Sequence, residues 1–188
     1  LKTALIGLIL SITSSANATL IEHITNGDFE TGDFSGWNVV NTGSGAWIIN
    51  DGTFDPAGSG GALVPIGGNY DALSHQTGPG FHNLFQDILL PNYFDTAFLS
   101  WDDRVRNQAS VFSDPNQEWR VLIEDLDGIL ISEVFSTDPG DVLQQVGPNS
   151  RGFDLTSLLK PLAGQNIRIS FEQQDSLLHF NASLDNVS

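Results

Sequence analysis

Cysteine and methionine are both absent from this chain of 188 residues, and cationic residues are scarce. The lack of cysteine excludes disulfide bonds, thiolate nucleophiles, iron–sulfur clusters and zinc sites built on cysteine. Seven Lys and Arg residues stand against 23 Asp and Glu residues, so the formal net charge is −16. Nucleic-acid binding needs clustered cations that displace counterions from phosphates. We therefore expect no nucleic acid among the partners of this acidic chain.

Long hydrophobic runs are also missing, and the apolar run at residues 4–12 is too short to cross a bilayer. This run follows Lys2 and precedes the small-residue site Ala16-Asn17-Ala18, an order that is typical of a secretory signal peptide. We expect residues 1–18 to be a signal-peptide helix and residues 19–188 to form one domain. Export without cysteine favours a bacterial secreted, extracellular or cell-surface protein, with no transmembrane segment in this chain.

Helical periodicity is almost absent, whereas short runs of alternating apolar and polar residues recur between turn residues. In residues 167–173, Ile167, Ile169 and Phe171 fall on one face of a predicted strand. Asp127-Gly128 between two apolar runs predicts a hairpin over residues 118–136 with a type I′ turn. Further strands are expected at residues 37–41, 47–50, 84–90, 97–105 and 180–187, and a helical turn at residues 155–162.

Strands that follow one another without helices predict an all-β fold, an antiparallel β-sandwich with one short helical turn. Two Gly-rich connections, residues 51–68 and 138–152, are expected to be surface loops at the ends of the sandwich.

The two ends of the expected domain carry related motifs, NGDFETGDFSGW at residues 26–37 and SLDNVS at residues 183–188. This pair resembles the ends of jelly-roll carbohydrate-binding modules and of galactose-binding-like domains, including those of bacterial secreted proteins with a PEP-CTERM sorting tail. A looser resemblance to MAM-type jelly rolls extends over Phe29-Glu30, Trp47, residues 70–84 and residues 184–187. The resemblance implies a jelly roll that binds glycans, and possible anchoring at the cell surface through a C-terminal tail beyond Ser188.

Oxygen-bearing side chains gather in both terminal motifs. Pairing of the first and last strands would bring Asp185 close to Asp28 and Glu30, and carboxylates with turn carbonyls suit Ca²⁺. The resembled modules hold a structural Ca²⁺ at this place, which implies Glu30 and Asp185 as the first ligands and Asp28 as a further one. Alternatively, these Asp and Asn residues only cap turns through bonds to their own backbone.

A sugar site would need exposed aromatic faces together with planar polar side chains. Arg104, Arg106 and Arg120 fall in two predicted strands that we expect to be adjacent, where they would either contact a glycan or form cross-strand ion pairs. The expected ligand-binding residues are Trp47, Tyr70, His75, His82, Trp101, Arg104, Arg106 and Trp119, and Phe81 is a further aromatic candidate.

The sequence offers little evidence of catalysis, because it contains no Gly-x-Ser-x-Gly elbow, phosphate-binding loop or metal-ligand histidine spacing. The sequence therefore favours a secreted, non-catalytic module that binds a polysaccharide or glycoconjugate and contains structural calcium. One alternative is a surface or matrix adhesion protein without a sugar site. Another is a glycan-active hydrolase or lyase that uses two of the many acidic residues. Exposed tryptophans at positions 47, 101 and 119 would favour the sugar site, and buried ones would favour the adhesion protein.

Overall fold

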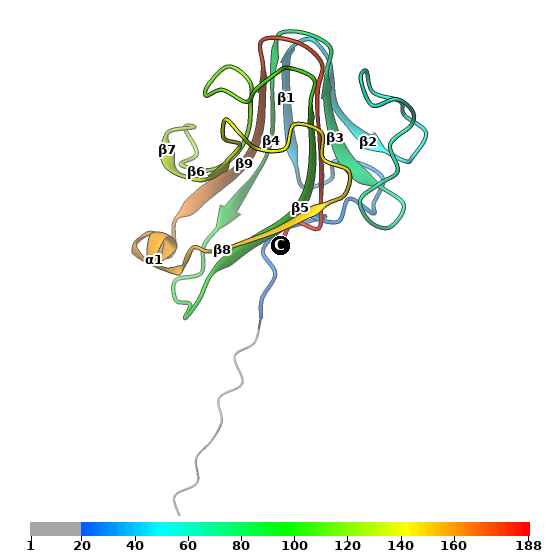
Figure 1. Cartoon of the computed structure of the whole chain (residues 1–188). Helices are drawn as coiled ribbons and strands as arrows, with labels where there is room; N and C mark the ends of the chain where they lie inside the picture. Colours follow the sequence, from blue (N-terminus) through cyan, green and yellow to red (C-terminus); the bar gives the residue numbers. More distant parts are fainter. Residues whose placement is uncertain (1–19) are drawn as a thin grey trace, which may run out of the picture.

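Two antiparallel five-stranded sheets form a sandwich in the computed structural model, which describes residues 20–188 (Figure 1). Sheet A has the order β1 (Asn38–Gly43), β4 (Gly80–Leu89), β9 (Asn166–Asp175), β6 (Glu118–Glu124) and β7 (Leu130–Ser136). Sheet B has the order β2 (Ala46–Asn50), β3 (Asp71–Gln76), β10 (Phe180–Asp185), β5 (Phe98–Asn107) and β8 (Asn149–Asp154). Helix α1 (Thr156–Leu159) continues into a 3₁₀ turn at Lys160–Leu162.

The predicted all-β sandwich is thereby confirmed, as is the helical turn. The predicted signal segment, residues 1–18, lies outside the described residues. Between residues 20 and 188, no helix combines the length and the apolar character that a membrane span requires.

The hairpin of β6 and β7 confirms the signal from Asp127-Gly128, but the predicted turn type is wrong. Gly128 alone of the pair has positive φ, at 80°. The Asp125 carboxylate accepts the N–H groups of Asp127 and Ile129, and the Ile129 carbonyl accepts the N–H of Asp125. A longer connection stabilised by the Asp125 side chain therefore replaces the two-residue type I′ turn.

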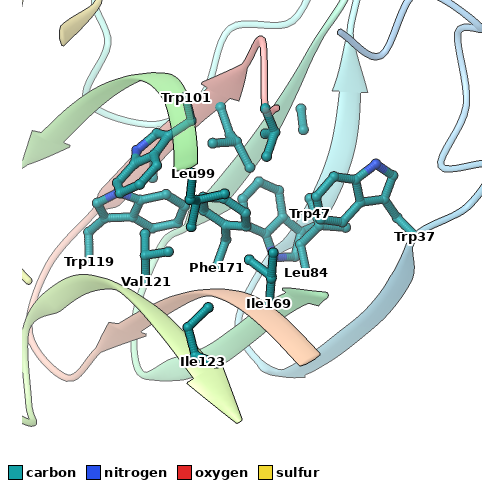
Figure 2. Packing of buried hydrophobic residues seen from close by; sticks show 14 of the residues in the cluster. Trp37, Trp47, Leu84, Leu99, Trp101, Trp119, Val121, Ile123, Ile169 and Phe171 are labelled. Carbon is teal, nitrogen blue, oxygen red and sulfur yellow. The ribbon is translucent and has the colours of Figure 1, made fainter. Parts of the chain in front are cut away.

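Phe171 of β9 lies at the centre of the core between the sheets, and Figure 2 shows it among the indole rings. Its ring centroid is 5.7 Å from that of Trp101, 6.0 Å from that of Trp37 and 6.1 Å from that of Trp119. Ile167 and Ile169 are buried on the same side of β9. The predicted register of this strand is confirmed.

The Gly-rich segment 51–68 was expected at an end of the sandwich, and this prediction is wrong. The segment packs on the outer face of sheet B. Side chains of that face donate hydrogen bonds to its carbonyl groups: Arg104 to Val64 at 2.8 Å, Asn50 to Leu63 at 3.0 Å and Asn181 to Ala57 at 2.9 Å. Sheet B is thus covered on both faces over this region.

The first and last strands do not pair, contrary to the expectation for the terminal motifs. Strand β1 belongs to sheet A, whereas β10 lies in the middle of sheet B. The motifs meet through the segment that precedes β1, because the N–H of Val187 donates to the Gly27 carbonyl at 2.9 Å. The C-terminus accordingly lies beside the N-terminal segment, drawn in blue in Figure 1.

Candidate functional site

The three tryptophans expected to stack on sugars are buried, so their prediction as ligand-binding residues is wrong. Trp47, Trp101 and Trp119 point between the sheets, and none is more than 4% exposed. The physical reason is strand alternation, which puts each of these tryptophans on the inner face of its sheet, where Phe171 also lies. His82 is also inaccessible, and its Nδ1 lies 2.8 Å from the Ser74 hydroxyl inside the sandwich. Buried tryptophans are what the adhesion alternative predicts.

Arg104 and Arg106 hold the segment 51–68 in place, so the structure does not support their prediction as glycan ligands. Arg104 lies 3.7 Å from the Asp71 carboxylate and donates to the Val64 carbonyl, while Arg106 donates to carbonyls of Ser59 and Gln145. Burial raises the pKa of Asp71 to about 6. Strands β5 and β6 lie in different sheets, so the expected adjacency of these arginines to Arg120 is wrong.

His75 and Tyr70 also lie at structural positions. His75, on the outer side of β3, packs against Phe54 of the covering segment with ring centroids 4.7 Å apart. The ring of Tyr70 lies against Gly32, where an added Cβ would approach it to 3.4 Å. None of the eight expected ligand-binding residues lies on the outer face of sheet A, whereas the further candidates Phe81 and Arg120 do.

That outer face carries a network of polar side chains that extends over three strands. We call it face A and define it by the outward-pointing side chains of β4, β9 and β6. Its members are Phe81, Asn83, Phe85, Asp87, Glu118, Arg120, Leu122, Glu124, Arg168, Ser170, Glu172 and Gln174.

The centre of face A is a chain of planar polar groups across the three strands. The carboxylate of Glu172 accepts hydrogen bonds from Arg120 Nε at 2.7 Å and from Asn83 Nδ2 at 3.1 Å. Arg120 Nη1 also lies 3.0 Å from Glu118 Oε1. Register explains this arrangement, because Arg120 is opposite Glu172 and Glu172 is opposite Asn83.

A second set of polar contacts lies further along the same strands, in the two outward-facing rows that follow. Arg168 binds both carboxylate oxygens of Asp87, at 2.8 and 3.2 Å, and its guanidinium lies 3.8 Å from the centre of the Phe85 ring. The Ser170 hydroxyl donates to Glu124 at 2.5 Å. Phe85 and Phe81 are both half-buried, so part of each ring faces solvent beside the polar groups.

Burial affects the pKa values of the two central acids, Glu118 and Glu172. It raises the pKa of Glu118 to about 7, since the opposing effect of Arg120 is smaller and Asp114, Glu133 and Glu172 add negative charge nearby. Burial also raises the pKa of Glu172, against the effect of Arg120. Both carboxylate oxygens of Glu118 are enclosed and have no hydrogen-bond partner of suitable geometry among the described residues.

The structure brings Glu30 and Asp185, two of the expected calcium ligands, to one loop that precedes β3 and lies beside the end of β10. An added Cβ on Gly68 would lie 2.1 Å from Glu30 Oε1, and one on Gly67 would lie 3.1 Å from Asp185 Oδ2. Asn69 and Tyr70 donate backbone N–H groups to Glu30, at 2.7 and 3.0 Å, and these bonds, together with one from the Asn69 side chain, lower its pKa.

Asp185 has the opposite character, because burial, together with Asp71 and Asp102, raises its pKa to about 7. Asp28 stays exposed, and its carboxylate accepts the N–H of Glu30 at 3.4 Å, as the turn-capping alternative expects. Across residues 20–188, no three His, Asp or Glu side chains are grouped as a metal site. Any ion at this loop would therefore need backbone carbonyl ligands besides Glu30 and Asp185.

A pocket of about 610 Å³ lies at the open edge between β7 and β8. Phe135, Arg151 and the segment 138–149 line it. The guanidinium of Arg151 lies 3.8 Å from the centre of the Phe135 ring and is bound by the buried carboxylate of Asp103. Asp103 also accepts the indole N–H groups of Trp101 and Trp119. The positive charge of Arg151, which lines the pocket, is therefore balanced by Asp103.

No family model matches the sequence, and no curated protein matches it. Solved structures that share the fold include carbohydrate-binding modules. Among solved structures, the chain is similar to TmCBM61 in complex with β-1,4-galactotriose, with TM-score 0.56 and 14% identity over 89% of this chain and 97% of that one. It is also similar to carbohydrate-binding modules of the β-sandwich superfamily, with TM-score 0.52 and 16% identity over 86% of this chain and 59% of that one.

An enzyme shares the same architecture. The Stig cyclase Fisc from Fischerella sp. TAU, in complex with (3Z)-3-(1-methyl-2-pyrrolidinylidene)-3H-indole, is similar with TM-score 0.53 and 16% identity, over 87% of this chain and 93% of that one. At such identities the likeness shows the jelly-roll fold alone.

Proposed function

We propose that the protein is a secreted, non-catalytic module that binds a polysaccharide or glycoconjugate on face A. The observation that carries this proposal is the contrast between the two outer faces. The side chains of sheet B bind the carbonyls of segment 51–68, whereas the described hydrogen bonds of face A run between its own strands. Planar polar groups beside partly exposed Phe81 and Phe85 rings are the chemistry that sugar hydroxyls and sugar C–H faces require. Carbohydrate-binding modules among the structural neighbours support the proposal.

The hydrolase alternative would use Glu118 as a general acid, because a carboxyl group with a pKa near 7 suits that role. The side chain of Glu118 is only 1% exposed, however, and both its oxygens are enclosed by neighbouring groups. A general acid must come within hydrogen-bond reach of the glycosidic oxygen. This geometry favours binding over hydrolysis. The adhesion alternative keeps the support of the buried tryptophans, and a binding experiment separates it from the glycan-binding module.

A glycan array probed with the intact protein is expected to show retention on at least one class of polysaccharide. Phe85→Ala and Asn83→Ala should each weaken that binding by about tenfold, since each removes a contact of face A. Phe98→Ala is the matched control, because Phe98 is 65% exposed but belongs to sheet B. Affinity electrophoresis of the three variants measures the effect. Retention by no glycan, with the protein folded, would favour the adhesion protein.

We further propose that Ca²⁺ binds at the loop of Gly67 and Gly68, with Glu30 and Asp185 as side-chain ligands. The support is a buried carboxyl group, Asp185, with Asp71 and Asp102 nearby, together with a glycine loop whose lack of side chains lets the carboxylates of Glu30 and Asp185 approach its backbone closely. Asp28 is the weakest of the three expected ligands, since its carboxylate is engaged in its own turn.

Calcium is expected to raise the melting temperature, and free ion at about 100 times its Kd should add roughly 2.7 kcal/mol of stability. Asp185→Asn should abolish this gain, whereas Asp114→Asn should preserve it.

The pH dependence follows from Asp185, whose pKa is raised in the folded protein without the ion. The stability that its protonated carboxyl group contributes is present at low pH and is lost as the pH rises through about 7. Calcium needs the ionised carboxylate, so its affinity should increase over the same range. Equal melting shifts with Mg²⁺, or a calcium shift in Asp185→Asn, would leave these residues as turn caps.

A further inference from the structure

Both cations of face A are already bound by carboxylates of the same face. Arg120 lies between Glu118 and Glu172, with Nη1 3.0 Å from one and Nε 2.7 Å from the other. Arg168 uses Nε and Nη2 on the two oxygens of Asp87 and stacks on Phe85. In Arg168 the Nε and Nη2 pair is occupied, and in Arg120 each pair of neighbouring donors has one nitrogen engaged by a carboxylate. Neither guanidinium therefore offers an unoccupied bidentate pair to an incoming anion.

No other described cation can serve that face. Arg104 and Arg106 lie under the segment 51–68 on the opposite sheet, and Arg151 is bound by Asp103. Lys160 follows α1. Face A therefore presents four carboxyl groups, those of Asp87, Glu118, Glu124 and Glu172, against two guanidinium groups that are already paired.

The same carboxylates are suited to uncharged sugar rings. A carboxylate has about four lone-pair directions, and that of Asp87, whose side chain is 39% exposed, accepts only two described hydrogen bonds from protein donors. The remaining acceptor capacity fits the hydroxyl donors of a sugar. A uronate or sulfate group would instead meet like charge without a free cation, which disfavours its binding.

Building on the proposed glycan site, we propose that face A selects glycans that carry neither carboxylate nor sulfate groups. Asp87 and Glu172 are the specificity-determining residues, because they occupy Arg168 and Arg120. Asp87 is the more accessible of the two, with 39% of its side chain exposed against 6% for Glu172. Its replacement is therefore the change least expected to disturb the fold.

The test compares neutral polysaccharides (galactan, glucomannan and xyloglucan) with polyuronates (polygalacturonate and alginate) by affinity electrophoresis at low and physiological salt. The wild-type protein should bind its best neutral polymer at least about tenfold more tightly than any polyuronate. Asp87→Asn should reduce the ratio of neutral-polymer affinity to polyuronate affinity by about tenfold, because it frees Arg168 for a uronate carboxylate. Glu172→Gln should act in the same direction through Arg120.

Asp55→Asn is the control for net charge, because Asp55 lies in the segment that covers sheet B and its carboxylate accepts the Ser59 hydroxyl. It should leave the neutral-to-uronate ratio unchanged. Polyuronate binding by the wild type as tight as neutral binding would overturn the selectivity while preserving the glycan site. An unchanged ratio in both Asp87→Asn and Glu172→Gln would overturn the roles of these residues. Retention by no polymer of either class would remove the glycan site itself.

Discussion

Phe171→Ala is expected to lower the free energy of unfolding by roughly 3–5 kcal/mol, the range for truncating a fully buried phenylalanine. The ring is inaccessible to solvent and contacts Trp37, Trp101 and Trp119 from both sheets. Alanine would leave a cavity that these rigid indoles cannot fill without movement. Denaturant unfolding followed by tryptophan fluorescence measures the change, since the cavity adjoins three of the four tryptophans.

Phe98→Ala serves as the matched control for that experiment. It removes the same atoms from a strand residue that is 65% exposed, and should cost about 0.5 kcal/mol or less. Similar costs for Phe171→Ala and Phe98→Ala would mean that the register of β9 is wrong, because a shift of one residue exchanges the two faces of a strand.

Arg151→Ala is expected to cost roughly 3–5 kcal/mol, because it leaves the carboxylate of Asp103 buried without its cation. Asp103 is fully buried and receives two hydrogen bonds from Arg151. The indoles of Trp101 and Trp119 and the amide of Asn149 would remain as neutral donors, which compensate a buried charge only in part. The loss should appear as a lower denaturant midpoint.

The pair of Arg168 and Asp87 provides a close chemical match for this comparison. Both arginines bind an aspartate through two nitrogens, and each stacks 3.8 Å above a phenylalanine ring. The aspartates differ in burial, because the side chain of Asp87 is 39% exposed and that of Asp103 is inaccessible. Arg168→Ala should therefore cost under about 1 kcal/mol. Equal costs for the two arginine variants would show that burial of the carboxylate does not determine the effect.

Strands with one apolar face could be predicted from the sequence, as the alternation of β9 shows, and the turn residues of the hairpin predicted β6 and β7. Strand β3 could not, because its sequence DALSHQ alternates neither in hydrophobicity nor in size. Leu73 is buried under segment 51–68, while Ala72 faces the core, so both faces of β3 are covered and each face mixes polar with apolar residues. Strand β8 lies at an edge of sheet B and carries few apolar residues.

The candidate site was harder to predict than the fold, because it depends on which strands become neighbours. Arg120 was considered with Arg104 and Arg106, but β5 and β6 lie in different sheets. Glu172 and Asn83 join Arg120 only through the order β4-β9-β6, which no local pattern encodes. The sequence signal for this site was the alternation of β9. Because Phe171 faces the core, the neighbouring Glu172 must point to the outer face of the sheet.

The most direct measurement of the central claim is an amide ¹H–¹⁵N NMR titration of the protein with an oligosaccharide from the polysaccharide that it binds best. If face A holds the ligand, the largest shifts should fall on β4, β9 and β6, and the guanidinium Nε signals of Arg120 and Arg168 should move with them. Residues of β3, β10 and β5 should stay unchanged. Shifts confined to sheet B or to the pocket lined by Phe135 and Arg151 would contradict a glycan site on face A. So would a titration in which no oligosaccharide causes any shift.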